Sequence, residues 1–193
     1  EEGWNAIRVR LFVEPDRASA EHKGEGVCQD LDYVMKLGQR IKKAGYQFML
    51  DFHYSDTWAD PGNQFMPYRW KNSGVASLPD SVYQYTRKSL EVMVKAGACP
   101  DLIQVGNEIT NGMMWPAAKV EPLGKDNWDI LVKLLESGAK ACREVCPRAK
   151  IIIHTEKAGE WDKTKSYYNH LRQLDYDAVS YTHLRAHETR GNL

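Results

Sequence analysis

The sequence predicts an α/β fold of the (β/α)8 TIM-barrel class, incomplete, with about five of the eight strand–helix units present. Short apolar runs alternate with longer amphipathic runs along the chain, which is typical of a parallel sheet covered by helices. A doubly wound open sheet also fits that alternation. The barrel is favoured because no Gly-x-Gly-x-x-Gly turn or phosphate loop follows any strand, whereas polar, aromatic-rich loops follow strand after strand.

The first expected strand covers residues 6–12, where Arg8 and Arg10 share one face because side chains alternate along a strand. Apolar positions at helical spacing predict a helix over residues 31–44, ended by Gly45. The same reasoning gives the later elements: a strand at 46–52, a helix at 79–95 ended by Gly97, a strand at 102–105, a helix at 128–146 stopped by Pro147, a strand at 151–153, a helix at 163–174 and the start of a strand at 177–179.

These elements amount to five strands with four helices between them, whereas a full eight-unit barrel needs about 250 residues. The chain has 193 residues and opens inside an element rather than with methionine, so we expect residues 1–179 to be a partial barrel domain. Residues 180–193 lose the apolar period and are expected to be non-native junction sequence, with a genuine variable tail as the alternative. His183, His187 and Glu188 in that segment are therefore not taken as a metal site.

Charge and composition give no support to several classes of partner and site. The 26 lysine and arginine residues balance 26 aspartate and glutamate residues, so nothing predicts nucleic acid or an anionic membrane as a partner. No apolar run approaches the roughly 18 residues that span a bilayer, and the chain shows no signal peptide. We expect a monomer without cofactor or metal. The four cysteines, at positions 28, 99, 142 and 146, are interpreted as small buried residues rather than as a disulfide framework or a zinc site.

Two residues at the end of the third expected strand predict sugar-cutting chemistry. Asn107 and Glu108 follow the apolar run 102–105, so an amide and a carboxylate stand where a buried strand ends. A partly buried glutamate near a second carboxylate has a raised pKa and can hold the proton that the leaving oxygen of a glycoside needs. Glu108 is the expected acid and later base, and Asn107 could bind the sugar hydroxyl beside the reacting carbon. The alternative is a helix cap or turn formed by Asn107 or Asn111.

Charged groups on the first two strands could complete such a site. Asp51 and His53 lie two residues apart, so both could face a barrel interior and hold sugar hydroxyls or orient the acid. A purely structural histidine is the alternative. A charged pair inside a barrel must be paired, so either arginine of the first strand could hold a catalytic carboxylate ionised. Arg10 is favoured over Arg8 because it is nearer the strand's carboxyl end.

Loops and the fourth strand supply the remaining candidates. Trp58 and Trp115 follow strands on the loop side and could stack on sugar rings, against the alternative of loop packing. Asp56, in the loop after the second strand, is a further candidate for substrate binding. His154 and Glu156 end the fourth strand and are secondary candidates, His154 for substrate binding.

Three segments carry a family resemblance: DFHYSDTWADP at residues 51–61, QVGNEITNGMMWP at 104–116 and RVRLFVEP at 8–15. They resemble glycoside hydrolase family 53, the endo-β-1,4-galactanases, and the similarity covers roughly residues 3–179. It implies a (β/α)8 barrel that cuts the β-1,4-galactan of pectic arabinogalactan with retention of configuration. It also implies that Glu108 is the acid/base on barrel strand four, beside Asn107, so that the chain holds about strands two to six.

The resemblance also implies a residue that has no counterpart here. The family's nucleophilic glutamate belongs on strand seven, and Asp51 and Glu156, on strands three and five, are poor substitutes. Residues 1–179 would then be a partial glycosidase catalytic domain. We expect the parent protein to be a secreted galactanase and this chain alone to be inactive. Two alternatives stay open: a barrel that cuts xylan, mannan or cellulose, and a non-catalytic, truncated sugar-binding fragment.

Overall fold

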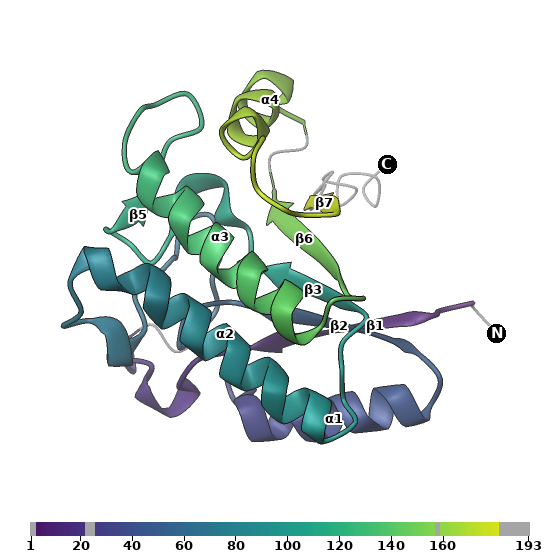
Figure 1. The fold of residues 1–193 in the computed structure, drawn as a ribbon. Helices are drawn as coiled ribbons and strands as arrows, with labels where there is room; N and C mark the ends of the chain where they lie inside the picture. Colours follow the sequence, from purple (N-terminus) through teal and green to yellow (C-terminus); the bar gives the residue numbers. More distant parts are fainter. Residues whose placement is uncertain (1–2, 22–25, 157–158, 182–193) are drawn as a thin grey trace, which may run out of the picture.

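The computed structural model describes residues 3–21, 26–156 and 159–181, and it contains a five-stranded parallel sheet (Figure 1). The strands lie in the order β1-β2-β3-β6-β7, and every neighbouring pair is parallel. This confirms the predicted parallel sheet, and all carboxyl ends of its strands meet at one edge. The strands are β1 (Ala6–Leu11), β2 (Gln47–Phe52), β3 (Leu102–Val105), β6 (Lys150–Thr155) and β7 (Ala178–Tyr181).

Four α-helices connect these strands: α1 (Leu31–Lys43), α2 (Leu78–Lys95), α3 (Trp128–Val145) and α4 (Trp161–His170). Helices α1, α2 and α3 lie along one side of the sheet, and α4 lies near its β6–β7 end (Figure 1). The Asp30 carboxylate begins α1 by accepting a hydrogen bond of 2.8 Å from the Tyr33 amide, which satisfies a donor that the first helical turn leaves free.

Apolar strand side chains fill the space between the sheet and these helices. Gly38 of α1 and Gly138 of α3 let the helices approach closely, because a Cβ atom on either would lie 2.7 Å from the Phe48 ring or 2.8 Å from the Val105 side chain. The strand residues that form this layer are all buried: Val9, Leu11, Phe48, Leu50, Phe52, Ile103, Val105, Ile151 and Ile153.

Helix α4 is shorter than predicted. It ends at His170, whereas the apolar spacing predicted a helix up to residue 174. The chain continues in tight turns, in which the Leu171 amide donates to the Tyr168 carbonyl and the Leu174 amide to the Leu171 carbonyl. Leu171 and Leu174 are still buried, so two successive turns place the same apolar residues against the core as a longer helix would.

Short elements in the loops were not predicted. Among the described residues, 3-10 helices lie at Pro15–Arg17, Tyr68–Trp70, Val75–Ser77 and Ile109–Asn111. A small antiparallel pair, β4 (Gly112–Met113) with β5 (Ala118–Lys119), follows the third strand of the sheet. Trp115 lies in the turn between β4 and β5, so this pair determines where that indole is held.

Strand β7 extends past the expected domain boundary at residue 179. Ser180 pairs with His154 across the β6–β7 register, so the first residues assigned to the tail belong to the sheet. His183, His187 and Glu188 lie outside the described residues. In the described part, no helix has the length and apolar character needed to cross a membrane, and no group of three or more potential metal ligands occurs there.

All four cysteines were predicted to be buried, but only two of them are. Cys142 and Cys146 are buried on α3 and at its end, as expected, but Cys28 is exposed and Cys99 is half-buried. Cys28 lies in the loop before α1, outside the apolar layer. The interpretation was therefore correct only for the two cysteines in helical sequence.

Candidate active site

The face of the sheet opposite the helices carries polar side chains. Side chains alternate along each strand, and the register aligns Arg10 with Asp51, Asp51 with Gln104, and Gln104 with Ile152. These residues therefore share one face, which in a closed barrel would be the interior. The polar residues on it, or just past its carboxyl edge, are Arg8, Arg10, Asp51, His53, Gln104 and His154.

Asp51 is at the centre of the site and is fully buried. One carboxylate oxygen lies 2.8 Å from the Arg8 guanidinium and 3.2 Å from His53 Nε2. The other oxygen accepts a 2.7 Å hydrogen bond from Gln104 Nε2. Strands β1 and β3, and His53 just after β2, thus contribute groups that offset the cost of burying this charge.

The arginine that pairs with the Asp51 carboxylate is Arg8 rather than Arg10, which was favoured for holding a catalytic carboxylate; that role stays a prediction. Arg10 lies level with Asp51 in the register, but its guanidinium sits 4.7 Å above the Trp58 ring instead. Arg8 starts two residues lower on the same face, and its long side chain reaches up to the carboxylate. The indole that covers Arg10 therefore decides which arginine is available for the ion pair.

Asn107 is held by side chains of β1 and β6 and by the loop that contains Ala59 and Gln64. Its Oδ1 accepts a 2.6 Å hydrogen bond from Arg8, and its Nδ2 donates to the Ala59 carbonyl at 2.7 Å. Gln64 Nε2 donates to its backbone carbonyl at 2.8 Å, and His154 Nδ1 lies 3.0 Å from its Oδ1. The side chain therefore does not cap a helix, so the alternative of an Asn107 cap was wrong.

Glu108 follows in a left-handed backbone conformation, with φ of 49°. This conformation is costly for a side chain other than glycine, and such residues cluster at functional sites. The Glu108 amide donates to His154 Nδ1 at 3.3 Å, and Gln64 Nε2 donates to the Glu108 carbonyl at 3.3 Å. The backbone of this half-buried glutamate is thereby held on both sides at the carboxyl end of β3.

His154 is buried and neutral at ordinary pH. Burial, together with the nearby Arg8 charge, lowers the pKa of its imidazole to about 4, although Asp51 acts in the opposite direction. Its Nδ1 contacts both the Asn107 oxygen and the Glu108 amide. These contacts belong to different tautomers, because Nδ1 donates to the oxygen only when it carries the proton. Either way, His154 links the two residues at the strand end.

His53 contacts protein groups on both sides of its ring. Its Nδ1 accepts a 3.0 Å hydrogen bond from the Ala59 amide, which leaves the proton on Nε2, the atom facing Asp51. Phe12 and Trp58 approach the ring edge-on, with centroid distances of 5.0 and 6.0 Å. These contacts fix the His53 ring with Nε2 beside Asp51, whereas its two predicted roles, holding sugar hydroxyls or orienting Glu108, stay predictions.

Asp56 and Trp115 form their hydrogen bonds with loop residues and not with Asp51. The two Asp56 oxygens accept backbone hydrogen bonds from Glu14 at 2.9 Å and Tyr68 at 2.7 Å, and burial raises the pKa of this carboxyl group. The Trp115 indole donates to the Asn111 carbonyl at 2.8 Å. Asp56 and Trp115 nevertheless both line one hollow of about 240 Å³.

Two glutamines of this site were not predicted. Gln104 donates to Asp51 and also contacts the Asn107 oxygen at 3.1 Å. Gln104 is a polar residue between Ile103 and Val105 in an otherwise apolar strand, and this position could have indicated a side chain that faces the interior. Gln64 had no such signal, because it lies in a long polar loop. Glu156, a secondary candidate, accepts a hydrogen bond from the Thr110 hydroxyl.

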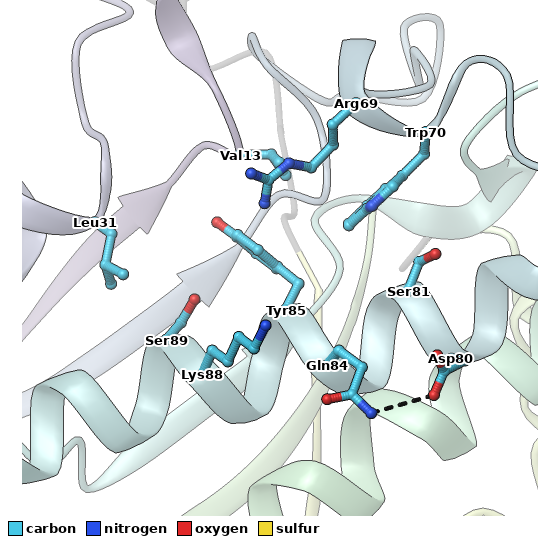
Figure 2. Close-up of a pocket in the computed structure, with 10 residues that line it drawn as sticks. All are labelled: Val13, Leu31, Arg69, Trp70, Asp80, Ser81, Gln84, Tyr85, Lys88 and Ser89. Carbon is cyan, nitrogen blue, oxygen red and sulfur yellow. Dashed lines mark hydrogen bonds between the residues drawn. The ribbon is translucent and has the colours of Figure 1, made fainter.

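A separate hollow of about 550 Å³ lies among the helices rather than on the polar face (Figure 2). Figure 2 shows Tyr85 and Lys88 of α2 pointing into it with Arg69, while Gln84 turns to Asp80. The Tyr85 hydroxyl donates to the Phe12 carbonyl at 3.2 Å. The network around Asp51 shares no residue with this hollow, so the candidate site is the polar face at the strand ends.

Comparison with known proteins shows which family the chain is similar to. The family model described as glycosyl hydrolase family 53 matches residues 1–192. A probable arabinogalactan endo-beta-1,4-galactanase A of Aspergillus fumigatus is 33% identical over 92% of this chain and 48% of that protein. An arabinogalactan endo-beta-1,4-galactanase of Humicola insolens is 34% identical over 89% of this chain and 48% of its own length. The chain thus spans about half the length of these relatives.

Solved structures give the same result. The Ignisphaera aggregans GH53 catalytic domain superposes with a TM-score of 0.80 at 32% identity, covering 93% of this chain and 48% of that one. A fungal β-1,4-galactanase structure gives 0.78 at 32% identity, covering 92% of this chain and 51% of that one. These matches confirm both the family resemblance and the predicted class, part of a (β/α)8 barrel.

Proposed function

This chain belongs to glycosyl hydrolase family 53, and we propose that the whole protein is an endo-acting glycosidase that cleaves the β-1,4-galactan of pectic arabinogalactan. The observation that carries the proposal is the Asn107–Glu108 pair at the carboxyl end of β3, held by Arg8, Gln64 and His154. Relatives named as arabinogalactan endo-beta-1,4-galactanases support the choice of substrate.

In the proposed mechanism, Glu108 first protonates the leaving oxygen and then removes a proton from the attacking water. A retaining glycosidase needs a second carboxylate about 5–5.5 Å away to attack the sugar carbon. We place that nucleophile on the seventh barrel strand, beyond the five strands described. The 193-residue chain alone is therefore expected to release no sugar from galactan.

The network around Asp51 supports a role in binding. Arg8 and the Ala59 carbonyl orient the Asn107 amide, so this side chain can bind the hydroxyl beside the reacting carbon at little entropic cost. Because His154 stays neutral, it adds no positive charge next to Glu108 above a pH of about 4. Arg10, with Trp58 beneath it, supplies an aromatic and cationic surface beside the same strand end.

The test uses the full-length protein on a panel of galactan, xylan, mannan and cellulose, with release of reducing ends as the readout. We expect activity on galactan, and Glu108→Gln should lower it by roughly 10²- to 10⁴-fold, the range typical of a lost general acid. The control is Glu136→Gln, the same change at an exposed position of α3, which should leave the rate unchanged. Equal rates for both variants, or a preference for xylan, would contradict the proposal.

Stereochemistry and location are tested separately. Proton NMR of the first products should show the β-anomer, as retention requires; initial α-anomer would mean an inverting enzyme instead. We also propose that the protein is secreted and monomeric, since its polymeric substrate lies outside cells. Activity in the culture medium and the elution volume of the full-length protein in size-exclusion chromatography test these two points.

A further inference from the structure

Two of the four cysteines lie in contact, although neither belongs to the candidate active site. Cys99 is in the loop that leads into β3, and Cys146 follows the last residue of α3. Their sulfur atoms are 3.5 Å apart, while the residues are 47 positions apart in sequence. The contact therefore joins two segments that only the fold brings together.

The surroundings of this pair suit bond formation. A disulfide has its sulfurs about 2.05 Å apart, so closing the pair needs a movement of about 1.5 Å. Cys146 is fixed by its amide, which donates to the Cys142 carbonyl at 2.8 Å. Cys99 is half-buried and lies outside the regular elements, so it is the more exposed member of the pair.

We propose that Cys99 and Cys146 are a redox-active thiol pair that forms an intramolecular disulfide when the protein meets a small-molecule disulfide such as oxidised glutathione. The Cys99 thiolate attacks one glutathione sulfur and expels the other half as glutathione thiolate. Cys146 then loses its proton and attacks the Cys99 sulfur, which expels the second glutathione. Two protein thiols are oxidised to one disulfide, and one glutathione disulfide is reduced to two thiols.

The other cysteines do not compete for this bond. Cys142 is fully buried on α3, where burial raises the pKa of its thiol far above the usual range. Cys28 is exposed in the loop before α1 and is not in contact with another thiol in the described residues. Burial and the neighbouring Cys99 also raise the pKa of Cys146 to about 12, so closure should speed up as the pH rises.

The test incubates the 193-residue chain with oxidised glutathione and maps its peptides by mass spectrometry without reduction. We expect one disulfide, Cys99–Cys146, and no glutathione bound to either of these two cysteines at completion, whereas the exposed Cys28 can carry one glutathione. The oxidised chain should melt about 5–10 °C higher, because the bond closes a long loop in the unfolded state. Dithiothreitol should reverse both changes.

Two matched variants sharpen this test. Cys146→Ser should stop the reaction halfway, with glutathione retained on Cys99, whereas Cys28→Ser should leave the formation of the pair unchanged. The proposal is overturned by a mixture of pairings among the cysteines, by glutathione that stays on Cys99 of the unsubstituted chain, or by no oxidation at either position. The mapping needs no substitution, so it decides the question even if a variant fails to fold.

Discussion

On the helix-covered face of the sheet the strands present isoleucine, leucine, valine and phenylalanine, whereas the opposite face presents two arginines, an aspartate and a glutamine. Apolar packing has no directional requirement, so the first face needs only side chains of suitable volume. Each group on the second face needs a particular partner, and Asp51 takes its partners from two neighbouring strands and from His53, just past the end of its own strand. The first face should therefore respond to lost volume, and the second to a single lost charge.

The largest effect is expected from the isoleucines of β6, which alternate between the faces. Ile153 is fully buried in the apolar layer, whereas Ile152 is aligned with Gln104 on the polar face and lies outside that hydrophobic cluster. Ile153→Ala should lower the free energy of unfolding by about 2–5 kcal/mol through lost burial and a residual cavity. Ile152→Ala should cost less, and urea denaturation of both variants compares the two losses. Equal losses would mean that the faces do not differ in packing.

Loss of one charge tests the polar face. Arg8→Ala removes the guanidinium beside the fully buried Asp51 carboxylate and should cost about 2–4 kcal/mol, less than for a pair that is buried on both sides. Adding Asp51→Asn neutralises the unpaired group, so the double variant should lose less than the sum of the single losses. The two single variants, the double variant and the unsubstituted chain form a cycle measured by urea denaturation. Strict additivity would contradict direct coupling.

Lowering the pH should lower the free energy of unfolding through protonation of His154. Its imidazole has a pKa of about 4 in the folded state and about 6.5 in an unfolded chain. Between these values the unfolded state takes up a proton that the folded state refuses, so stability falls as the pH drops from 6.5 to 4. The loss from this group should be at most about 3 kcal/mol, with no contribution above pH 6.5.

The control for this pH effect is His154→Asn, whose amide can replace Nδ1 but does not titrate. In that variant, the part of the stability loss between pH 6.5 and 4 that comes from this site should disappear. Unfolding measured in denaturant at a series of pH values gives both curves. Identical slopes for the two proteins would show that His154 is not the responsible group.

Much of the sheet could be predicted because its signals are local. The apolar run 102–105 and the amide and carboxylate after it are visible in the sequence, and so is the alternation that puts Arg8 and Arg10 on one face. The choice between those arginines was not visible, since it depends on the Trp58 ring that covers Arg10. Sequence spacing shows which side chains share a face, but the loop that folds over that face decides which of them meet.

Helix α4 and the Cys99–Cys146 contact show the same limit. Leu171 and Leu174 have helical spacing, but successive turns bury them equally well, so periodicity does not distinguish the two conformations. Cys142 and Cys146 lie one helical turn apart in the sequence, whereas the observed sulfur contact joins Cys146 to a distant loop. Contacts between segments far apart in sequence leave no periodic signal.

The smallest expected effect concerns two tyrosine hydroxyls beneath the apolar face. The Tyr54 hydroxyl shares a 2.7 Å hydrogen bond with Thr86 of α2, whereas the Tyr167 hydroxyl is buried without a hydrogen-bond partner in the described residues. Tyr54→Phe should cost about 1 kcal/mol, because it leaves the Thr86 hydroxyl with one partner fewer in a buried site. Tyr167→Phe removes a polar group that gains nothing from burial, so the chain should be equally stable or gain up to about 1 kcal/mol. Urea denaturation of the two variants gives the comparison, and a larger loss from Tyr167→Phe would show that its hydroxyl binds a group, such as a buried water, that offsets its burial.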